Sequence, residues 1–472
     1  MDNRFLNVLN ALGYKTVKQD YYSQIELWEE WYKGPVKKFH NYNIWNGQKF
    51  VECKKMTAGM AKKVAEDWAD LCMSEKVAIT LDGKKEQEFW DSVCVNNNFK
   101  IMSNRYEELA FALGTSAIVA RVDGMTVDGN GAAVGNTGEI KFDYIQAKHI
   151  FPLTWENGIV TECAFASSKT VKGKEYLYLQ IHKLVNGKYD IENRLYLADN
   201  GSLEPKKLED VEGFENIPEI FHTQQTEPLF VLNSPNLANS LDVNCPLGIS
   251  IYANAIDQLK AVDNSFDSFN NEIILSRKRI AVKAEMMKGV KGEQVFDTND
   301  VVFYYMPEDS QPGSMIQDLS TNMRIDELYR ALQMSLNALS LKCGLGANRW
   351  KFDAGNITTA TQVMSANSDA FRTLKKHELV LENVLKSLVK TVLRLGNTFL
   401  NAGLNEDADI TIDFDDSIIE DTGAEFERDI RLLQLGIIRR EEMRAWYKDE
   451  SLEEAKKKLP QLEAMAEAPE EE

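Results

Sequence analysis

Four aspartates near the C-terminus, Asp409, Asp413, Asp415 and Asp416, have the residue types and spacing for metal chemistry. If residues 410–416 form a strand, Asp409, Asp413 and Asp415 share one face, because side chains alternate between the two faces of a strand. Such a carboxylate group can seat Mg²⁺ and activate water in a nuclease. The segment has no Glu-x-Lys pair and no neighbouring histidine base. We therefore expect no metal site here and keep a metal-dependent nuclease as the alternative.

Other catalytic motifs are missing from the sequence. It contains no Gly-x-x-x-x-Gly-Lys-[Ser/Thr], so the chain has no phosphate-cradling loop and is not expected to be an ATPase. It also lacks a Gly-x-Ser-x-Gly nucleophile turn. The glycines Gly129, Gly131 and Gly135 do not have the Gly-x-Gly-x-x-Gly spacing of a dinucleotide site. We expect no enzymatic activity and no cofactor.

Metal ligands of other kinds are also poorly placed. Asp128 and Asn130 begin like a calcium loop, but Ala132 and Ala133 stand where a ligand and the required glycine belong. The histidines are far apart in sequence, which favours structural roles: His40, His149, His182, His222 and His377. The six cysteines have no Cys-x-x-Cys spacing, which favours free thiols in a reducing cytoplasm over disulfides or zinc.

Length and charge limit the class of protein. A chain of 472 residues exceeds what one hydrophobic core usually serves, so we expect more than one structural unit. No apolar run approaches the roughly 20 residues of a membrane span, and the first residues do not resemble a secretion signal. The net charge of −19 would repel a DNA duplex over most of the surface. Either DNA is irrelevant to this chain, or DNA must pass it without sticking.

Hydrophobic periodicity divides the first half of the chain into a helical part and a β part. Residues 1–120 have helical spacing and many aromatic residues, and Thr57 is expected to cap a helix that runs to Cys72. Residues 116–228 alternate with period two and contain turn signals, among them Asn186-Gly187. This pattern predicts an antiparallel β region.

The second half is dominated by long helical patterns. One runs from Leu247 to about Ser276, and another from about Thr321 to Lys342, where Gly344 ends it. A short β-rich insert separates them, so the two helices could pack side by side as a stalk with the insert at its tip. A glycine-rich loop, residues 344–357, leads to a helix from about Thr358 to Leu395. The strand at 410–416 and a helical end with an acidic tail complete the chain.

Several short motifs occur in an order that is similar to one known family. They are Trp28, Trp31, Tyr32, Gly34, His40 and Tyr42; Glu75 before Val77-Ala78-Ile79; Pro246 to Tyr252; Gly344 to Asp353; Thr358 to Val363; and Asp413 to Ile419 with Asp421. This order resembles the portal protein of tailed bacteriophages, specifically of the group found in long-tailed phages of Gram-positive bacteria.

The resemblance implies an α+β fold that is mainly helical, with the portal architecture. By the resemblance, residues 1–245 form the wing, with a helical N-terminal part followed by the antiparallel β region. The other segments would be stem helix 1 (246–276), a small α/β clip (277–320), stem helix 2 (321–343), the tunnel loop (344–357), a long wing helix plus β segment (358–422), and the helical crown with its acidic tail (423–472).

The resemblance also implies a function without catalysis. Such proteins form a ring, usually of twelve copies, at one vertex of the capsid, and double-stranded DNA enters and leaves through its centre. The implied partners are other copies of the chain, the terminase packaging motor, a head–tail adaptor, the scaffold and the major capsid protein, with no membrane. The chain would be a virion component assembled in the host cytoplasm. Two alternatives remain: a metal-dependent nuclease of the packaging machinery, and a scaffolding or adaptor protein without a channel.

Basic residues are the candidate contacts in this acidic chain. Those expected to face DNA in the channel are Asn348, Arg349, Lys351, Lys342 and Arg330. For Arg324 and Arg330, an ion pair on a solvated face, either between subunits or at i,i+4, is the competing interpretation. Trp350 and Phe352 are expected to anchor the loop against a neighbour rather than touch bases. The clip is expected to dock the motor or adaptor through its basic residues: Arg277, Lys278, Arg279, Lys283, Lys288 and Lys291.

Overall fold

The computed structural model describes residues 3–74, 76–128, 131–135, 137–199, 202–276, 279–283, 302–306, 316–318, 322–347, 349–350, 360–414, 422–448 and 452–458. The chain divides into a first unit that ends at Phe414 and a second unit that starts at Asp415. The mixture of helices and strands agrees with the predicted α+β class.

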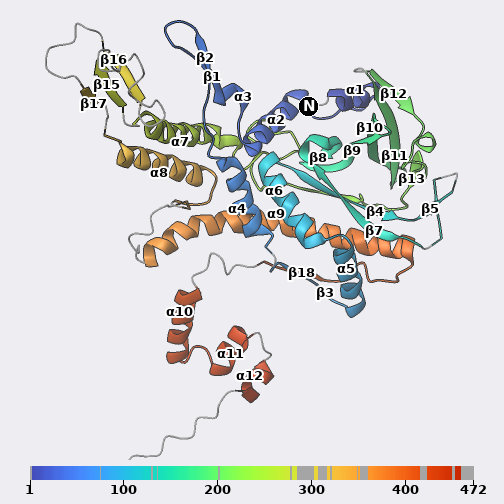
Figure 1. Ribbon diagram of the computed structural model, residues 1–472. Coiled ribbons are helices and arrows are strands. Elements are labelled where there is room, and N and C mark those ends of the chain that lie inside the picture. Colours follow the sequence, from blue (N-terminus) through green and yellow to red (C-terminus); the bar gives the residue numbers. More distant parts are fainter. Residues whose placement is uncertain are drawn as a thin grey trace, which may run out of the picture. The chain divides into compact units, whose positions relative to one another are not determined.

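Helices dominate the N-terminal part of the first unit, as the periodicity predicts (Figure 1). They are α1 (Asn3–Ala11), α2 (Gln19–Lys33), α3 (Lys37–His40), α4 (Met60–Cys72), α5 (Lys84–Asn96) and α6 (Phe99–Leu113). Their aromatic residues form much of the core, because Tyr22, Trp28, Trp68 and Phe111 are among the largest fully buried side chains. Burying one such ring contributes about 2–3 kcal/mol.

The β region follows, and its antiparallel pairing is confirmed. One sheet has the order β14 (Phe230–Asn233), β4 (Ser116–Asp123) and β7 (Glu139–Gln146). A larger sheet has the order β12 (Ser202–Lys206), β11 (Lys188–Asp199), β10 (Lys174–Val185), β9 (Ile159–Val171) and β8 (Ile150–Glu156), and β13 (Ile220–His222) also pairs with β11. Asn186 and Gly187 have φ values of 52° and 80°, the positive angles that a tight β10–β11 turn requires.

Smaller elements complete this part of the unit. The turns or short helices are η1 (Ala147–His149), η2 (Leu208–Asp210) and η3 (Ala253–Ala255), and β5 (Thr126–Val127) pairs with β6 (Ala133–Val134). Near the end of the unit, β18 (Ile410–Asp413) pairs antiparallel with β3 (Ala78–Leu81). The predicted strand at this position is confirmed over residues 410–413.

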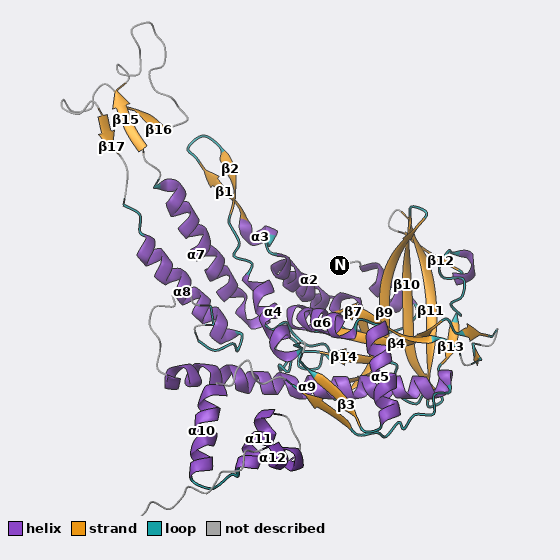
Figure 2. Cartoon of the chain, turned by 60° about the horizontal axis from the view of Figure 1, so that its bottom comes forward, coloured by secondary structure: helices purple, strands orange, loops and turns teal. Residues whose placement is uncertain are grey.

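Two helices with a small sheet between them in sequence form the third part of the unit. The helices are α7 (Ile256–Leu275) and α8 (Ile325–Lys342). In the sheet, β15 (Arg279–Lys283) pairs parallel with β16 (Val302–Met306) and antiparallel with β17 (Ile316–Asp318). Figures 1 and 2 show α7 and α8 lying side by side.

The longest helix described, α9 (Ala360–Leu400), crosses the first unit and packs on α4, α5, β4 and β14 (Figure 2). Its inward stripe is buried and includes Leu374, Leu381, Leu385, Leu388 and Val392. The helix continues five residues beyond the predicted end at Leu395. The second unit contains α10 (Thr422–Gln434), α11 (Arg440–Lys448) and α12 (Leu452–Lys458), so the predicted helical end is confirmed there.

The structure corrects the prediction that the first 120 residues are helical. Residues 41–54 form an antiparallel hairpin, in which β1 (Asn41–Trp45) pairs with β2 (Phe50–Lys54). The sequence carries the signal for it, because Asn46-Gly47 is a preferred turn pair and lies between two β-prone segments. The helical prediction extended over Tyr42 and Trp45, which lie on β1, because helices flank this segment.

A second correction concerns the start of α7, which was predicted at Leu247 and lies at Ile256. The backbone of the preceding segment is bonded elsewhere: Gly248 N–H donates to Thr115 Oγ1 at 3.0 Å, and Ile251 N–H donates to Phe111 O at 2.9 Å. Gly114 allows this approach, since a Cβ there would lie 2.3 Å from the carbonyl oxygen of Gly248. Backbone groups used for tertiary contacts cannot also form a helix.

Smaller corrections concern helix starts. The residue before α4 is Gly59 in a left-handed conformation, so Thr57 is not its cap. Thr57 Oγ1 instead accepts a hydrogen bond from Gly59 N–H at 3.1 Å. Helix α8 begins at Ile325 rather than near Thr321.

Candidate DNA channel and docking surface

The α7–α8 pair is held by apolar packing and by polar contacts at two levels. Leu336 and Leu339 of α8 are buried, as are Leu259 and Val262 of α7. The hydroxyl oxygens of Ser265 and Ser335 lie 3.2 Å apart midway along the pair.

At the far end of the pair, Arg324 bonds Glu272 across the two helices, with Nη2 and Oε2 2.8 Å apart. The hydrogen bond from Arg324 lowers the pKa of Glu272. Arg324 therefore forms an ion pair, but with a residue of the other helix in the same chain rather than between subunits or at i,i+4.

The other side of α7 anchors a basic segment, residues 37–55, which we call the arm; it comprises α3 and the β1–β2 hairpin with its ends. The buried carboxylate of Asp263 accepts three hydrogen bonds: from His40 Nε2 at 3.0 Å, Thr57 Oγ1 at 3.2 Å and Ala58 N–H at 2.8 Å. His40 is 0% exposed. In the neutral imidazole, a proton on Nε2 leaves Nδ1 to accept from Val36 N–H, 2.9 Å away. Every acceptor and donor in this group has a partner.

Two more contacts fix the exit of the arm. Met56 N–H donates to Asp267 Oδ1 at 2.9 Å, and Lys55 Nζ donates to Asn264 Oδ1 at 2.9 Å. The Lys55 ammonium also lies 4.3 Å from the centre of the Phe39 ring, a cation–π distance. The arm is thus bound to successive turns of α7.

Sequence analysis missed this anchor, although a signal was present. Asp263 stands four residues after Leu259 and one after Val262, so it falls on the apolar stripe of α7. A carboxylate on a buried stripe requires donors. The interpretation of His40 as a structural histidine is confirmed, and Asp263 is the partner that the sequence could not identify.

The loop after α8 is tightly packed where it begins. Gly344 has φ +80°, and a Cβ there would lie 2.9 Å from Thr373 Cγ2. The indole N–H of Trp68 donates to Cys343 O at 3.0 Å, and Ser340 Oγ donates to Gly346 O at 2.5 Å. The predicted glycine-rich loop is therefore packed against α4 and α9 where it begins.

Arg349 and Trp350 both bond the same buried acid. Trp350 Nε1 donates to Asp67 Oδ2 at 2.9 Å, and Arg349 Nε lies 3.4 Å from that oxygen. Lys63 pairs with Asp67 Oδ1 at 2.8 Å, and this hydrogen bond raises the pKa of Lys63. Gln333 Nε2 donates to Trp350 O at 2.9 Å. Trp350 anchors the loop, as predicted, but against its own chain; Arg349 keeps 38% of its side chain exposed.

The remaining predicted contact residues are only partly described. Arg330 and Lys342 are exposed on α8. Arg279 and Lys283 lie on β15, but their side chains are not among the described parts. The other predicted residues, and Phe352, lie outside the described residues: Arg277, Lys278, Lys288, Lys291, Asn348 and Lys351. The exposure of all these side chains to DNA or partners stays a prediction.

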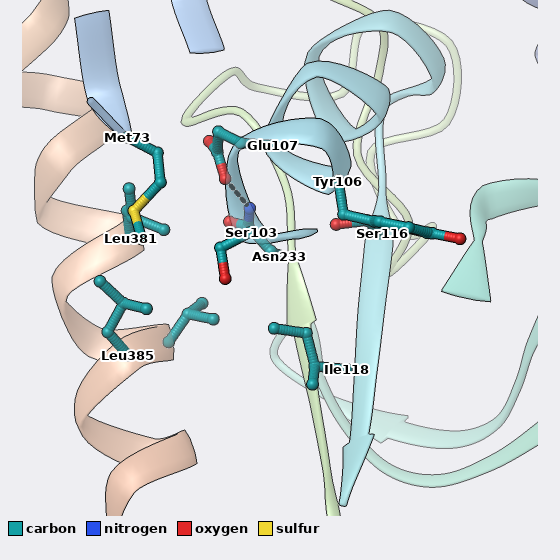
Figure 3. Close-up of a pocket in the computed structure, with 10 residues that line it drawn as sticks. Met73, Ser103, Tyr106, Glu107, Ser116, Ile118, Asn233, Leu381 and Leu385 are labelled. Carbon is teal, nitrogen blue, oxygen red and sulfur yellow. Dashed lines mark hydrogen bonds between the residues drawn. The ribbon is translucent and has the colours of Figure 1, made fainter. Parts of the chain in front are cut away.

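A small pocket between α6, α9 and β4 contains a buried acid (Figure 3). Burial raises the pKa of Glu107 to about 7, while the hydrogen bond from the Asn233 side-chain amide opposes that rise. The neighbouring side chains include Met73, Leu381 and Leu385, which are apolar. This acid is therefore part of the packing between α9 and the β14–β4–β7 sheet.

The aspartates considered for Mg²⁺ are separated from other ligands within the described residues. Asp413 pairs with Ala78 across β18 and β3. Asp415 and Asp416 lie outside the described part. Among the residues that were described and searched, no group of three or more His, Cys, Asp or Glu could hold a metal ion. Within the same residues, no helix has the length and hydrophobicity needed to cross a bilayer.

The described residues thus define an α+β protein whose buried polar groups hold an arm, a helix pair and a loop in place. A family model described as phage portal protein, SPP1 Gp6-like, matches residues 13–468. The chain belongs to this family of phage portal proteins, which are structural components of the virion. The resemblance inferred from the short motifs is confirmed. None of the curated proteins compared with the chain matches it.

Proposed function

We propose that this chain is the repeating subunit of a ring at one capsid vertex, through which viral DNA is packaged and ejected. The observation that carries the proposal is the family match over residues 13–468. The side-by-side helices α7 and α8 support it, because a stalk of two helices is what the portal resemblance requires of a stem.

The segments receive the roles that the resemblance implies. Residues 1–245 together with α9 and β18 form the wing, α7 and α8 form the stem, and residues 277–320 form the clip. Residues 344–357 form the tunnel loop, and the helices after residue 423 form the crown. The ring has twelve copies, and assembly occurs in the host cytoplasm. Its function is conduction and docking, without catalysis.

Charge supports a channel that does not retain DNA. Each copy carries −19, so a ring concentrates a negative field around its central hole. A duplex in such a hole meets few of the cation contacts that release counterions and hold DNA in place. Exposed Arg330 and Lys342 on α8, with Arg349 and Lys351 in the loop, supply transient contacts.

The clip is proposed to dock the terminase motor and later the head–tail adaptor. Its basic cluster is the densest in an acidic chain: Arg277, Lys278, Arg279, Lys283, Lys288 and Lys291. Scaffold and major capsid protein are proposed as partners of the wing and crown.

Negative-stain microscopy and native mass spectrometry of the purified chain test the ring directly. We expect closed rings with a central hole, and a chain that stays monomeric at every concentration contradicts the proposal. In a packaging assay, deletion of residues 346–355 should abolish DNA packaging while rings still form. Plasmid cleavage that needs Mg²⁺ and is lost in Asp413→Ala would instead establish the nuclease alternative.

A further inference from the structure

The hairpin of the arm exposes an aromatic pair that has nothing to pack on in the described chain. Trp45 and Phe50 stand opposite each other in the β1–β2 register, and their ring centroids lie 5.2 Å apart. Their exposed fractions are 55% and 69%. A two-stranded hairpin is only marginally stable in water without further packing. The contacts at the base of the arm fix where this pair is presented.

The helix α8 has a second apolar stripe that is also exposed. Its first stripe includes the buried Leu336 and Leu339. The second stripe lies on a different face, at intervals of three or four residues, and all of its members are exposed: Ala331, Met334, Ala338 and Leu341. Met334 is 76% exposed and Leu341 is 57% exposed. We call this second set the outer stripe.

The two exposed surfaces lie on opposite flanks of α7. Figures 1 and 2 both show α7 between α8 and the β1–β2 hairpin. The hairpin of one chain therefore cannot cover the outer stripe of the same chain without leaving its anchor on Asp263. Two different complementary patches on opposite flanks are what a head-to-tail interface needs, and such an interface gives a ring when the rotation between copies closes.

We propose that the Trp45–Phe50 pair of each copy packs on the outer stripe of a neighbouring copy of this chain. This inference rests on the proposed ring and assigns residues to its subunit interface. This packing removes apolar surface from water. It stabilises the interface by about 25 cal/mol for each Å² of apolar area buried.

Charge favours a second copy as the occupant. The arm carries five lysines against one glutamate in a chain whose net charge is −19. The arm thus has a net charge of +4, which leaves −23 for the rest of the chain, although Asp263, Asp267 and Glu272 of α7 are already bonded within their own copy. A basic arm is attracted at long range to the acidic remainder of a neighbouring copy.

The test compares exposed variants that leave the fold of a single copy intact. Trp45→Ser with Phe50→Ser removes the aromatic pair, and Met334→Glu places a charge on the outer stripe. Val95→Glu on α5 is the matched control, because Val95 is also 76% exposed. Sedimentation velocity and native mass spectrometry report the oligomers. We expect each interface variant to lower the ring fraction at least tenfold and the control to leave it unchanged.

Mixing the two variants tests the head-to-tail geometry. A hairpin variant keeps an intact outer stripe, and Met334→Glu keeps an intact hairpin, so an equimolar mixture has one good interface per pair. We expect mixed dimers and no closed rings, whereas each variant alone stays monomeric. A symmetric hairpin-to-hairpin contact would give no mixed dimers and would let Met334→Glu associate with itself, which overturns the inference.

The remaining outcomes separate this inference from the proposed function. Wild-type rings together with unchanged rings in both variants refute the interface alone and leave the channel in place. Rings that form normally in the hairpin variant but no longer retain DNA would assign the arm to nucleic acid instead of a second copy. A wild-type chain that forms no ring under any condition contradicts both proposals.

Discussion

Replacing Asp263 with alanine should release the arm from α7 while leaving the rest of the first unit folded. The Asp263 carboxylate is almost fully buried and accepts from His40, Thr57 and Ala58. An unsatisfied buried donor costs about 1–3 kcal/mol. After the substitution, the His40 ring N–H and the Ala58 backbone N–H can reach water only if the arm moves. The Thr57 hydroxyl can instead rotate to another partner. At about 1 kcal/mol for each lost bond, local opening of the arm becomes easier by about 3 kcal/mol.

Hydrogen exchange of amides in residues 41–58 measures this opening, since local unfolding controls exchange there. A loss of about 3 kcal/mol corresponds to roughly a hundredfold faster exchange. Exchange in β9–β11, remote from the arm in sequence, should not change. Ser268→Ala is the matched control, because Ser268 lies on an exposed face of the same helix.

Asp263→Asn adds a sharper test of the same network. The Asn amide nitrogen is a donor, so it fits opposite His40 Nε2 only if the imidazole proton moves to Nδ1. Val36 O lies 3.0 Å from His40 Nδ1 and can accept a hydrogen bond from the new N–H, but Val36 N–H then loses its acceptor, so one hydrogen bond is lost instead of three. We therefore expect Asn to accelerate exchange by less than tenfold. An Ala variant that exchanges within threefold of wild type, or an Asn variant as fast as Ala, would refute the hydrogen-bond argument.

Three other predictions concern the loop and the buried acid. Gly344→Ala should lower the free energy of unfolding by about 1–3 kcal/mol through strain. It should lower the denaturant midpoint more than Gly13→Ala does, because only a Cβ at residue 344 would lie 2.9 Å from Thr373 Cγ2. Equal changes in the two midpoints would count against this contact. Asp67→Ala should expose the loop after α8 to hydrogen exchange, and unchanged protection there would contradict the anchor. Since burial raises the pKa of Glu107 to about 7, the native state binds more protons than the unfolded state between about pH 4.5 and 7, and stability falls as pH rises through that window. Glu107→Gln should flatten this dependence and unfold at a higher temperature than wild type at pH 8; a thermal scan that shows the same pH slope in both would argue against the buried acid.

Much of the fold was predictable because local signals and tertiary packing agree. The alternation of residues 174–199 and the Asn186-Gly187 turn define the β10–β11 hairpin without help from the rest of the chain. The stripes of α7, α8 and α9 were also visible. The β1–β2 hairpin was missed because helices flank it and its strands bury little. The segment 247–255 was missed because its backbone bonds to residues of α6 and the turn after it, which are more than 100 positions away.

The candidate site was less predictable than the fold, for a physical reason. Sequence analysis can recognise that Arg349 is basic and lies next to glycines, but it cannot identify the distant acid that holds it. Asp67 and Arg349 are 282 positions apart, and His40 and Asp263 are 223 apart. Each pair joins two segments whose separate patterns show only one half of the contact. The family resemblance gave the roles of whole segments, but these pairings follow only from the coordinates.

These long-range pairs connect the arm, α4, the loop and the helix pair through one continuous series of contacts. The loop is bonded to α8 through Gln333 and to α4 through Asp67. The residues just before α4 are bonded to α7 through Asp263, and α7 packs along α8. A force on Trp350 therefore cannot move the loop alone: it must break the Asp67 contacts or tilt α8 against α7. If copies associate through the arm and the outer stripe, we expect that tilt to change the contact with the next copy.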